Sequence, residues 1–374
     1  MENFINGFIN NEFITAIIIS IIPLIFVLVY ALIAILGELK ISAFMQERLG
    51  PMRTGPWGIF QPIAEVIKLL QKEDITPDAV NKPLFNFAPF LMFAASYACF
   101  AVIPFSSHFI PASLNLGLFY LLAVGSIGVI SIVMGGWASN NKYSILGAMR
   151  SASQIVSYEL PAGICLLTIA ALTSTFTFSG LGVSKELMSA VGGTPNAFLG
   201  GLDIQHINVA QSGGFWNWFI FGGPGNITKI WVIPFTLGLT LIYFISSLAE
   251  TNRTPFDISE GESEIVAGYF IEYSGIKFAM FYFAEYANMY VVAAIMTILF
   301  LGGWTSPFGD FMNGPIWGAF WFVSKAFAVV FLQIWVRWTL PRLRVDQLMN
   351  IGWKVLLPLS LVCFLVISLW GILH

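Results

Sequence analysis

The chain has 374 residues, of which 57% are hydrophobic and 10% are charged. Soluble domains carry about 25% charged residues, so this composition indicates an integral membrane protein. The net charge of −3 argues against nucleic-acid binding as the main activity, because nucleic-acid-binding surfaces are basic.

Eight segments are long and apolar enough to cross a bilayer, which takes about 20 apolar residues. They cover roughly residues 13–36, 84–105, 116–138, 155–178, 230–249, 278–301, 316–338 and 352–372. No basic region and no small-residue cleavage site precedes the first segment, so we expect a retained helix and not a removed signal. The sequence therefore predicts a single all-α membrane domain over residues 1–374, with about eight transmembrane helices.

Lysine and arginine residues concentrate in the loops after the odd-numbered spans, at about 37–83, 139–154, 250–277 and 339–351. Loops rich in these residues face the cytoplasm, so both termini are expected on the outer side. The long loop at about 180–228 is then also outside, and it contains no pattern that predicts chemistry.

A short amphipathic helix is predicted in the first cytoplasmic loop, at about 58–73. Polar residues recur at helical spacing on one face, including Gln61, Glu65 and Lys68, and apolar residues occupy the other face. The segment is too short to span, so we expect it to lie in the membrane interface. Its pattern alone favours a generic surface anchor over a specific functional role.

The fourth span carries an acid, Glu159, whose setting depends on where its helix begins. If the helical pattern starts as early as Tyr143, Glu159 is an intramembrane acid that faces the protein interior. If the helix starts later, Glu159 lies at the level of the lipid headgroups. Pro161 is a predicted kink in this helix.

An acidic stretch at 249–264 follows the fifth span and surrounds one arginine, Arg253. Its acidic residues are Glu250, Asp257, Glu260, Glu262 and Glu264. Charge held against a membrane is costly, which favours a functional reason for it. Ser259 and Glu262 also fit a capping box, so helix initiation alone explains part of the acid content.

Further ionisable residues follow the acidic stretch. Glu260, Glu264 and Glu272 recur at multiples of four, which predicts one helical face, while Glu285 lies in the sixth span and Lys325 in the seventh. One buried acid can be a structural hydrogen-bonding group. Several ionisable groups on different helices indicate a polar path across part of the membrane.

Four motifs carry a resemblance to a known family and occur in the family's order. They are Glu-Arg-Leu-Gly-Pro at 47–51 with Gly-Pro-Trp-Gly-Ile-Phe-Gln-Pro at 55–62, Arg-Ser-Ala-Ser-Gln at 150–154 with Ser-Tyr-Glu-Leu at 157–160, the acidic stretch with Glu-Tyr at 272–273 and 285–286, and Leu-Pro-Arg-Leu-Arg-Val-Asp-Gln-Leu-Met at 340–349. Over about residues 12–370, the chain resembles the membrane subunit of respiratory complex I that adjoins the peripheral arm, which is subunit 1 in mitochondria and the H subunit in bacteria.

The resemblance implies the quinone-chamber subunit of a proton-pumping NADH:quinone oxidoreductase. The chamber entrance is then expected between the first helix, the amphipathic helix and the sixth helix. Residues implied to line or flank the chamber are Glu38, Arg48, Arg53, Arg253, Asp257, Glu260, Glu262 and Glu264. Residues implied to continue as a proton path are Glu159, Glu250, Glu272, Glu285 and Lys325.

The resemblance also implies which molecules meet this chain. Quinone (ubiquinone or menaquinone) is the substrate, and the chain is expected to hold no cofactor. FMN, NADH and the iron–sulfur clusters belong to partner subunits. The expected partners are the peripheral-arm subunits at the quinone site, small membrane subunits and the lipid of a bacterial inner membrane.

Some alternatives stay open at the level of sequence. Arg253 could serve only to neutralise Asp257 and Glu250, and Arg342 and Arg344 are predicted to be interfacial anchors because they lie beside a helix end. The whole chain could instead be a transporter acting alone, although no internal repeat typical of transporters is visible. It could also be a structural scaffold, but a scaffold role does not explain why an acid, Glu285, lies within a membrane span.

Overall fold

In the computed structural model of the protein, residues 12–106, 109, 111, 114, 117–178, 207–208, 211, 213–223, 230–258, 261, 265–309, 311–312 and 314–373 are described, and every regular element among them is a helix. The long elements are α2 (Glu12–Met45), α4 (Lys82–Cys99), α5 (Gly117–Ala138), α6 (Lys142–Phe178), α10 (Ile233–Glu250), α12 (Gly275–Phe300), α13 (Pro315–Thr339) and α15 (Leu357–Leu373). The shorter ones are η1 (Pro56–Gly58), α3 (Gln61–Gln71), η2 (Phe215–Asn217), η3 (Phe219–Phe221), η5 (Gly268–Phe270), α14 (Val345–Asn350) and the π-helix η6 (Ile351–Leu356). The predicted all-α membrane fold is confirmed.

Each of the eight predicted spans corresponds to one long helix. Seven helical segments in the described part of the chain are long and apolar enough to cross a membrane, and α4 is the remaining one. α4 contains Pro83, Asn86, Pro89 and Ser96, which lower its mean hydropathy. α4 packs against α5 and α12, so neighbouring helices cover part of its less apolar surface.

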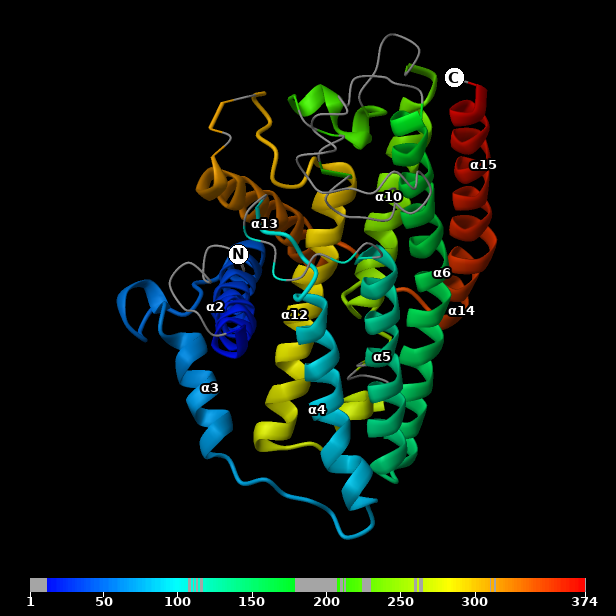
Figure 1. Ribbon diagram of the computed structural model, residues 1–374. Coiled ribbons are helices and arrows are strands. Elements are labelled where there is room, and N and C mark those ends of the chain that lie inside the picture. The colour runs from blue at the N-terminus through cyan, green and yellow to red at the C-terminus, as the bar shows by residue number, and fades with distance from the viewer. Residues whose placement is uncertain are drawn as a thin grey trace.

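α12 is the central helix of the bundle. It packs against α2, α3, α4, α10 and α13, and Figure 1 shows it between these helices. The most apolar 18-residue stretch of α12 is 89% buried, whereas the corresponding stretches of α2, α13 and α15 are 28–33% buried. Polar side chains in the inner part of α12, such as Glu285, are therefore buried in protein.

α6 begins at Lys142, close to the earlier of the two predicted starts, and contains Pro161 without ending there. Glu159 follows the first residue by 17 positions, which corresponds to roughly 26 Å at 1.5 Å per residue. The early start of α6 therefore favours Glu159 as an intramembrane acid and not as an acid at the level of the lipid headgroups.

The predicted amphipathic helix is α3, and it stands at the side of the bundle against α2 and α12 (Figure 1). The chain after α3 is fastened to the start of α12. Ser274 Oγ donates to the Glu73 carbonyl (3.2 Å) and accepts from the Ile75 amide (3.0 Å). Lys277 Nζ pairs with Asp74 at 2.9 Å. These contacts form a clasp between residues 73–75 and 274–277.

The chain between α10 and α12 does not continue one acidic helical face as far as Glu272, so that prediction was wrong. Residues 266–274 form turns and η5. Tyr269, Phe270 and Tyr273 are buried there against Phe281, and burial of three aromatic side chains outweighs the weak pattern of acidic spacing. Ser259, Glu260, Glu262 and Glu264, with the predicted capping box, lie outside the described residues.

α6 and η5 approach closely at two glycines. A Cβ atom built on Gly147 would lie 2.6 Å from the Cα atom of Gly268, a distance that forces one backbone to move. This contact holds η5 against α6 and fixes the position of Tyr269, the next residue.

We expect Gly147→Ala to destabilise the protein by about 1–3 kcal/mol, the usual cost of overpacking a close contact. The control is Gly37→Ala in α2, where a built Cβ meets nothing within 4 Å. Thermal unfolding of the detergent-solubilised protein measures both. Equal melting temperatures for the two variants would contradict the close contact.

Candidate functional site

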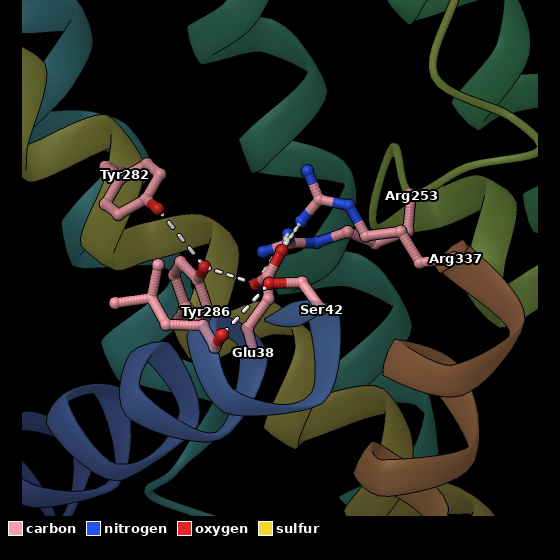
Figure 2. A network of polar contacts seen from close by, with 7 residues as sticks. Glu38, Ser42, Arg253, Tyr282, Tyr286 and Arg337 are labelled. Carbon is pink, nitrogen blue, oxygen red and sulfur yellow. Dashed lines mark hydrogen bonds and ion pairs between the residues drawn. The ribbon is translucent and has the colours of Figure 1, made fainter. Parts of the chain in front are cut away.

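Glu38 on α2 is the centre of a buried ion-pair cluster, shown in Figure 2. Its carboxylate accepts hydrogen bonds from Arg337 Nη1 on α13, from Arg253 Nη1 after α10 at 3.3 Å, and from the Tyr286 hydroxyl on α12 at 2.5 Å. Glu38 is 8% exposed and Arg253 is 6% exposed. One carboxylate thus connects four separate parts of the chain.

Two guanidinium groups approach the Glu38 carboxylate. The Arg253 guanidinium lies 4.6 Å from the centre of the Tyr286 ring, where the electron-rich face stabilises a cation. The Tyr282 hydroxyl lies 3.2 Å from the Tyr286 hydroxyl and extends the network along α12. The cluster therefore brings positively charged hydrogen-bond donors together with a carboxylate and two tyrosine hydroxyls.

The partners of the loop charges differ from those that sequence analysis considered. Arg253 pairs with Glu38, while Asp257 pairs with Arg342 at 2.9 Å. The interpretation of Arg253 as a neutraliser of Asp257 and Glu250 did not include Glu38, its ion-pair partner, although Arg253 also acts electrostatically on Asp257. Arg342 is a partner of Asp257 in addition to lying beside a helix end. Burial raises the pKa of Asp257 above its usual value, while the hydrogen bond from Arg342 acts in the opposite direction.

A second polar site is a cavity of about 50 Å³ on the other side of α12. Carboxylates from three helices line it: Glu159 of α6, Glu250 at the end of α10, and Glu285 of α12. Asn288 and Tyr243 add further polar groups. This volume is enough for a few water molecules, since one water needs about 10–15 Å³.

The cavity carboxylates are held in place by neighbouring helices. Glu159 Oε1 accepts a hydrogen bond from Ser126 Oγ of α5, and Glu285 Oε1 accepts one from the Tyr269 hydroxyl at 3.0 Å. Gln154 Nε2 donates to the Ala249 carbonyl at 2.8 Å and so connects α6 to the end of α10 beside Glu250. The first two bonds orient the Glu159 and Glu285 carboxylates, and the third holds the backbone next to Glu250.

α12 joins the two sites through adjacent residues. Glu285 lines the cavity and Tyr286 donates to Glu38, and successive side chains on a helix point about 100° apart. The ion-pair cluster and the carboxylate cavity are therefore separated by one helix backbone. A shift or rotation of α12 changes both sites together.

The remaining predicted site residues lie elsewhere. Glu272 accepts from Asn141 Nδ2 at 2.8 Å in the turn between α5 and α6. Arg48 and Arg53 are exposed in the loop between α2 and α3. Lys325 binds the carbonyls after α12, beyond Phe300, which lies 15 residues and roughly 23 Å from Glu285 along the helix. Glu260, Glu262 and Glu264 lie outside the described residues.

Sequence analysis missed several residues of the two sites. Arg337 counted only as one of the basic residues that predict the orientation of the chain in the membrane. No role in a site was given to Tyr286, Tyr282, Ser126 or Tyr269. A local signal existed for the tyrosines, because positions 282, 286 and 290 repeat every four residues along one face of α12. Arg337 gave no such signal, since its partner Glu38 lies 299 positions away.

The fold and the two sites define an integral membrane protein of many helices with ionisable groups deep inside the bundle. Such groups are costly in a membrane and mark pathways for ions, protons or charged substrates. Comparison with known proteins specifies the class further.

A family model described as NADH dehydrogenase matches residues 17–368. The H subunit of NADH-quinone oxidoreductase from Chlorobaculum parvum is 50% identical over 369 residues, which is 96% of this chain and 93% of that protein. The H subunit from Chlorobaculum tepidum is also 50% identical, with the same coverage. An H subunit from Cytophaga hutchinsonii, numbered 2, is 42% identical, and the match covers 93% of this chain and 96% of that protein.

The chain therefore belongs to the NADH dehydrogenase family of membrane subunits, as the H subunit of NADH-quinone oxidoreductase (respiratory complex I). It works as part of an oxidoreductase, and other subunits of the complex are its partners. Membership of this family excludes the alternative of a transporter that acts alone.

We expect Glu38→Gln to cost about 3–5 kcal/mol, because removal of one partner leaves buried positive charge uncompensated. The double variant Glu38→Gln with Arg337→Gln should be more stable than Glu38→Gln alone, since it removes one charge of each sign. Thermal unfolding of the purified complex compares these variants with Glu73→Gln, a control in an exposed acid. A Glu38→Gln variant as stable as the control would show that the ion pairs contribute little.

Proposed function

We propose that this chain guides quinone to the redox centre of the peripheral arm and couples quinone reduction to proton translocation. The observation that carries the proposal is the position of two polar sites on either side of α12, one with two arginines around Glu38 and one lined by three carboxylates. α3 supports the predicted entrance, because it contacts both α2 and α12 and exposes the apolar side chains of Ile63, Ile67 and Leu70.

The ion-pair cluster suits the chemistry of quinone reduction. Conversion of a quinone to a quinol takes two electrons and two protons, so negative charge develops on the oxygens before the protons arrive. Arg253 and Arg337 provide hydrogen-bond donors with positive charge, which stabilise such an anion. A developing anion then competes with Glu38 for the two guanidinium groups.

This competition gives a physical route from the cluster to the carboxylate cavity. When Arg253 and Arg337 turn toward a new anion, Glu38 loses compensating charge and attracts a proton more strongly. Tyr286 donates to Glu38 and adjoins Glu285, so a change at Glu38 reaches α12 directly. We propose that Glu159, Glu250 and Glu285 then exchange protons through water in their shared cavity.

The electrons arrive from outside the chain in this proposal. NADH, FMN and iron–sulfur clusters belong to partner subunits, and ubiquinone or menaquinone is the substrate that enters from the membrane. The partners include peripheral-arm subunits at the quinone site and small membrane subunits. The complex resides in the bacterial inner membrane, with both termini of this chain on the outer side.

The coupling proposal predicts that Glu159→Gln, Glu250→Gln and Glu285→Gln each lower NADH-driven quinone reduction about tenfold or more, equivalent to about 1.4 kcal/mol or more in the barrier. The amide keeps the shape of the side chain and removes its exchangeable proton. Quinone reduction and the proton-to-electron ratio are measured in proteoliposomes with enzyme whose subunit content has been verified.

The matched control for this series is Glu73→Gln, which should retain wild-type activity. Normal quinone reduction with an unchanged proton ratio in all three cavity variants would defeat the coupling role. It would instead favour a scaffold that only joins the arms of the complex.

The proposed orientation is tested separately by reporter fusions at the C-terminus. Alkaline phosphatase, which folds only outside the cytoplasm, should be active there, and green fluorescent protein exported to the same side should be dark. The reason is the excess of lysine and arginine in the loops after the odd-numbered spans. The reverse pattern of activities would invert the topology.

A further inference from the structure

Lys325 of α13 is enclosed by backbone carbonyls at the end of α12. Its Nζ atom donates to the carbonyls of Leu301 at 2.7 Å, Gly303 at 3.1 Å and Thr305 at 2.6 Å. A primary ammonium has three N–H donors, so three acceptors match its protonated form. A neutral amine has two donors and would leave one carbonyl unsatisfied.

Two glycines shape this group of carbonyls. Gly302 and Gly303 have φ angles of +75° and +50°, a left-handed conformation that glycine adopts without steric cost. They also sit against neighbouring side chains: a Cβ on Gly302 would lie 2.3 Å from Trp218 Nε1, and one on Gly303 would lie 1.5 Å from Asn208 Oδ1. The turn thus directs alternate carbonyls toward one point.

The loop that contains Trp218 closes the remaining side. Lys325 Nζ lies 4.3 Å from the centre of the Trp218 ring, within the range in which an aromatic face attracts a cation. Gln211 holds the loop in place, because its Nε2 donates to the Ile298 carbonyl at 2.8 Å and its Oε1 accepts from the Gly302 amide at 2.9 Å. Gln211 is fully buried.

We propose that the end of α12 forms a binding cage for a primary ammonium, made of the carbonyls of Leu301, Gly303 and Thr305 and the ring of Trp218. Lys325 fills the cage from within the chain as a resident cation. Leu301 caps the C-terminal end of α12, where the helix dipole attracts positive charge, and the carbonyls of Gly303 and Thr305 follow in the turn. The Lys325 ammonium therefore fastens the end of α12 to α13 and to the segment that contains Trp218.

The test removes the lysine side chain and supplies a free ammonium of similar shape. Lys325→Ala should lower the melting temperature of the purified complex. Millimolar propylammonium should then raise it again in a saturable manner, because the small cation occupies the empty cage. Propan-1-ol, a neutral molecule of the same size, should have no such effect.

Three controls separate this cage from general effects of salt or amines. Propylammonium should leave the wild-type melting temperature unchanged, because Lys325 already occupies the cage. It should also leave Lys68→Ala unchanged, since Lys68 is an exposed lysine of α3. The double variant Lys325→Ala with Trp218→Leu should bind propylammonium more weakly than Lys325→Ala alone.

If Lys325→Ala does not accumulate, propylammonium is supplied during expression and the recovered amount of assembled complex becomes the readout. Recovery with propylammonium and not with propan-1-ol supports the cage. Equal recovery with both, no recovery with either, or a Lys325→Ala variant as stable as wild type would overturn it. These readouts are stability and binding, so they are independent of the proposed proton coupling.

Discussion

The buried carboxylate of Glu38 is the interaction on which the arrangement of the helices depends. A charge buried in protein is tolerated only with close partners, and this one draws Arg253, Arg337 and Tyr286 to it from three other parts of the chain. Apolar packing between helices in lipid specifies their rotation weakly, because the alternative surroundings are equally apolar. The geometry of ion pairs therefore contributes strongly to how α2, α12 and α13 are turned relative to one another.

α12 is far more buried than α2, α13 and α15 at the periphery. It exposes little of its surface to lipid, which permits ionisable side chains on more than one of its faces. Glu285 lines the carboxylate cavity, and the adjacent Tyr286 belongs to the Glu38 cluster. The backbone of α12 lies between the cluster and the cavity.

The sequence was sufficient to predict the membrane fold, the short interfacial helix and the membership of Glu159, Glu250 and Glu285 in one group of acids. The fold and the short helix follow from hydropathy and helical period, whereas the grouping of these three acids was implied by the family resemblance. The pairing of Glu38 with Arg337 could not be predicted, because it depends on the tilt and rotation of distant helices. Local acid spacing was misleading at Glu272, where burial of Tyr269, Phe270 and Tyr273 decides the backbone. Lys325 was assigned with the acids from its charge, although its position along α13 places it at the far end of α12.

The clasp between residues 73–75 and 274–277 makes α3 and the first turn of α12 one mechanical unit. α3 exposes the apolar side chains of Ile63, Ile67 and Leu70, which a lipid surface would cover. Because of the clasp, a displacement of α3 moves the start of α12, the helix that carries Glu285. Whatever contacts the outer face of α3 is thereby connected mechanically to a helix whose far side faces the buried carboxylates.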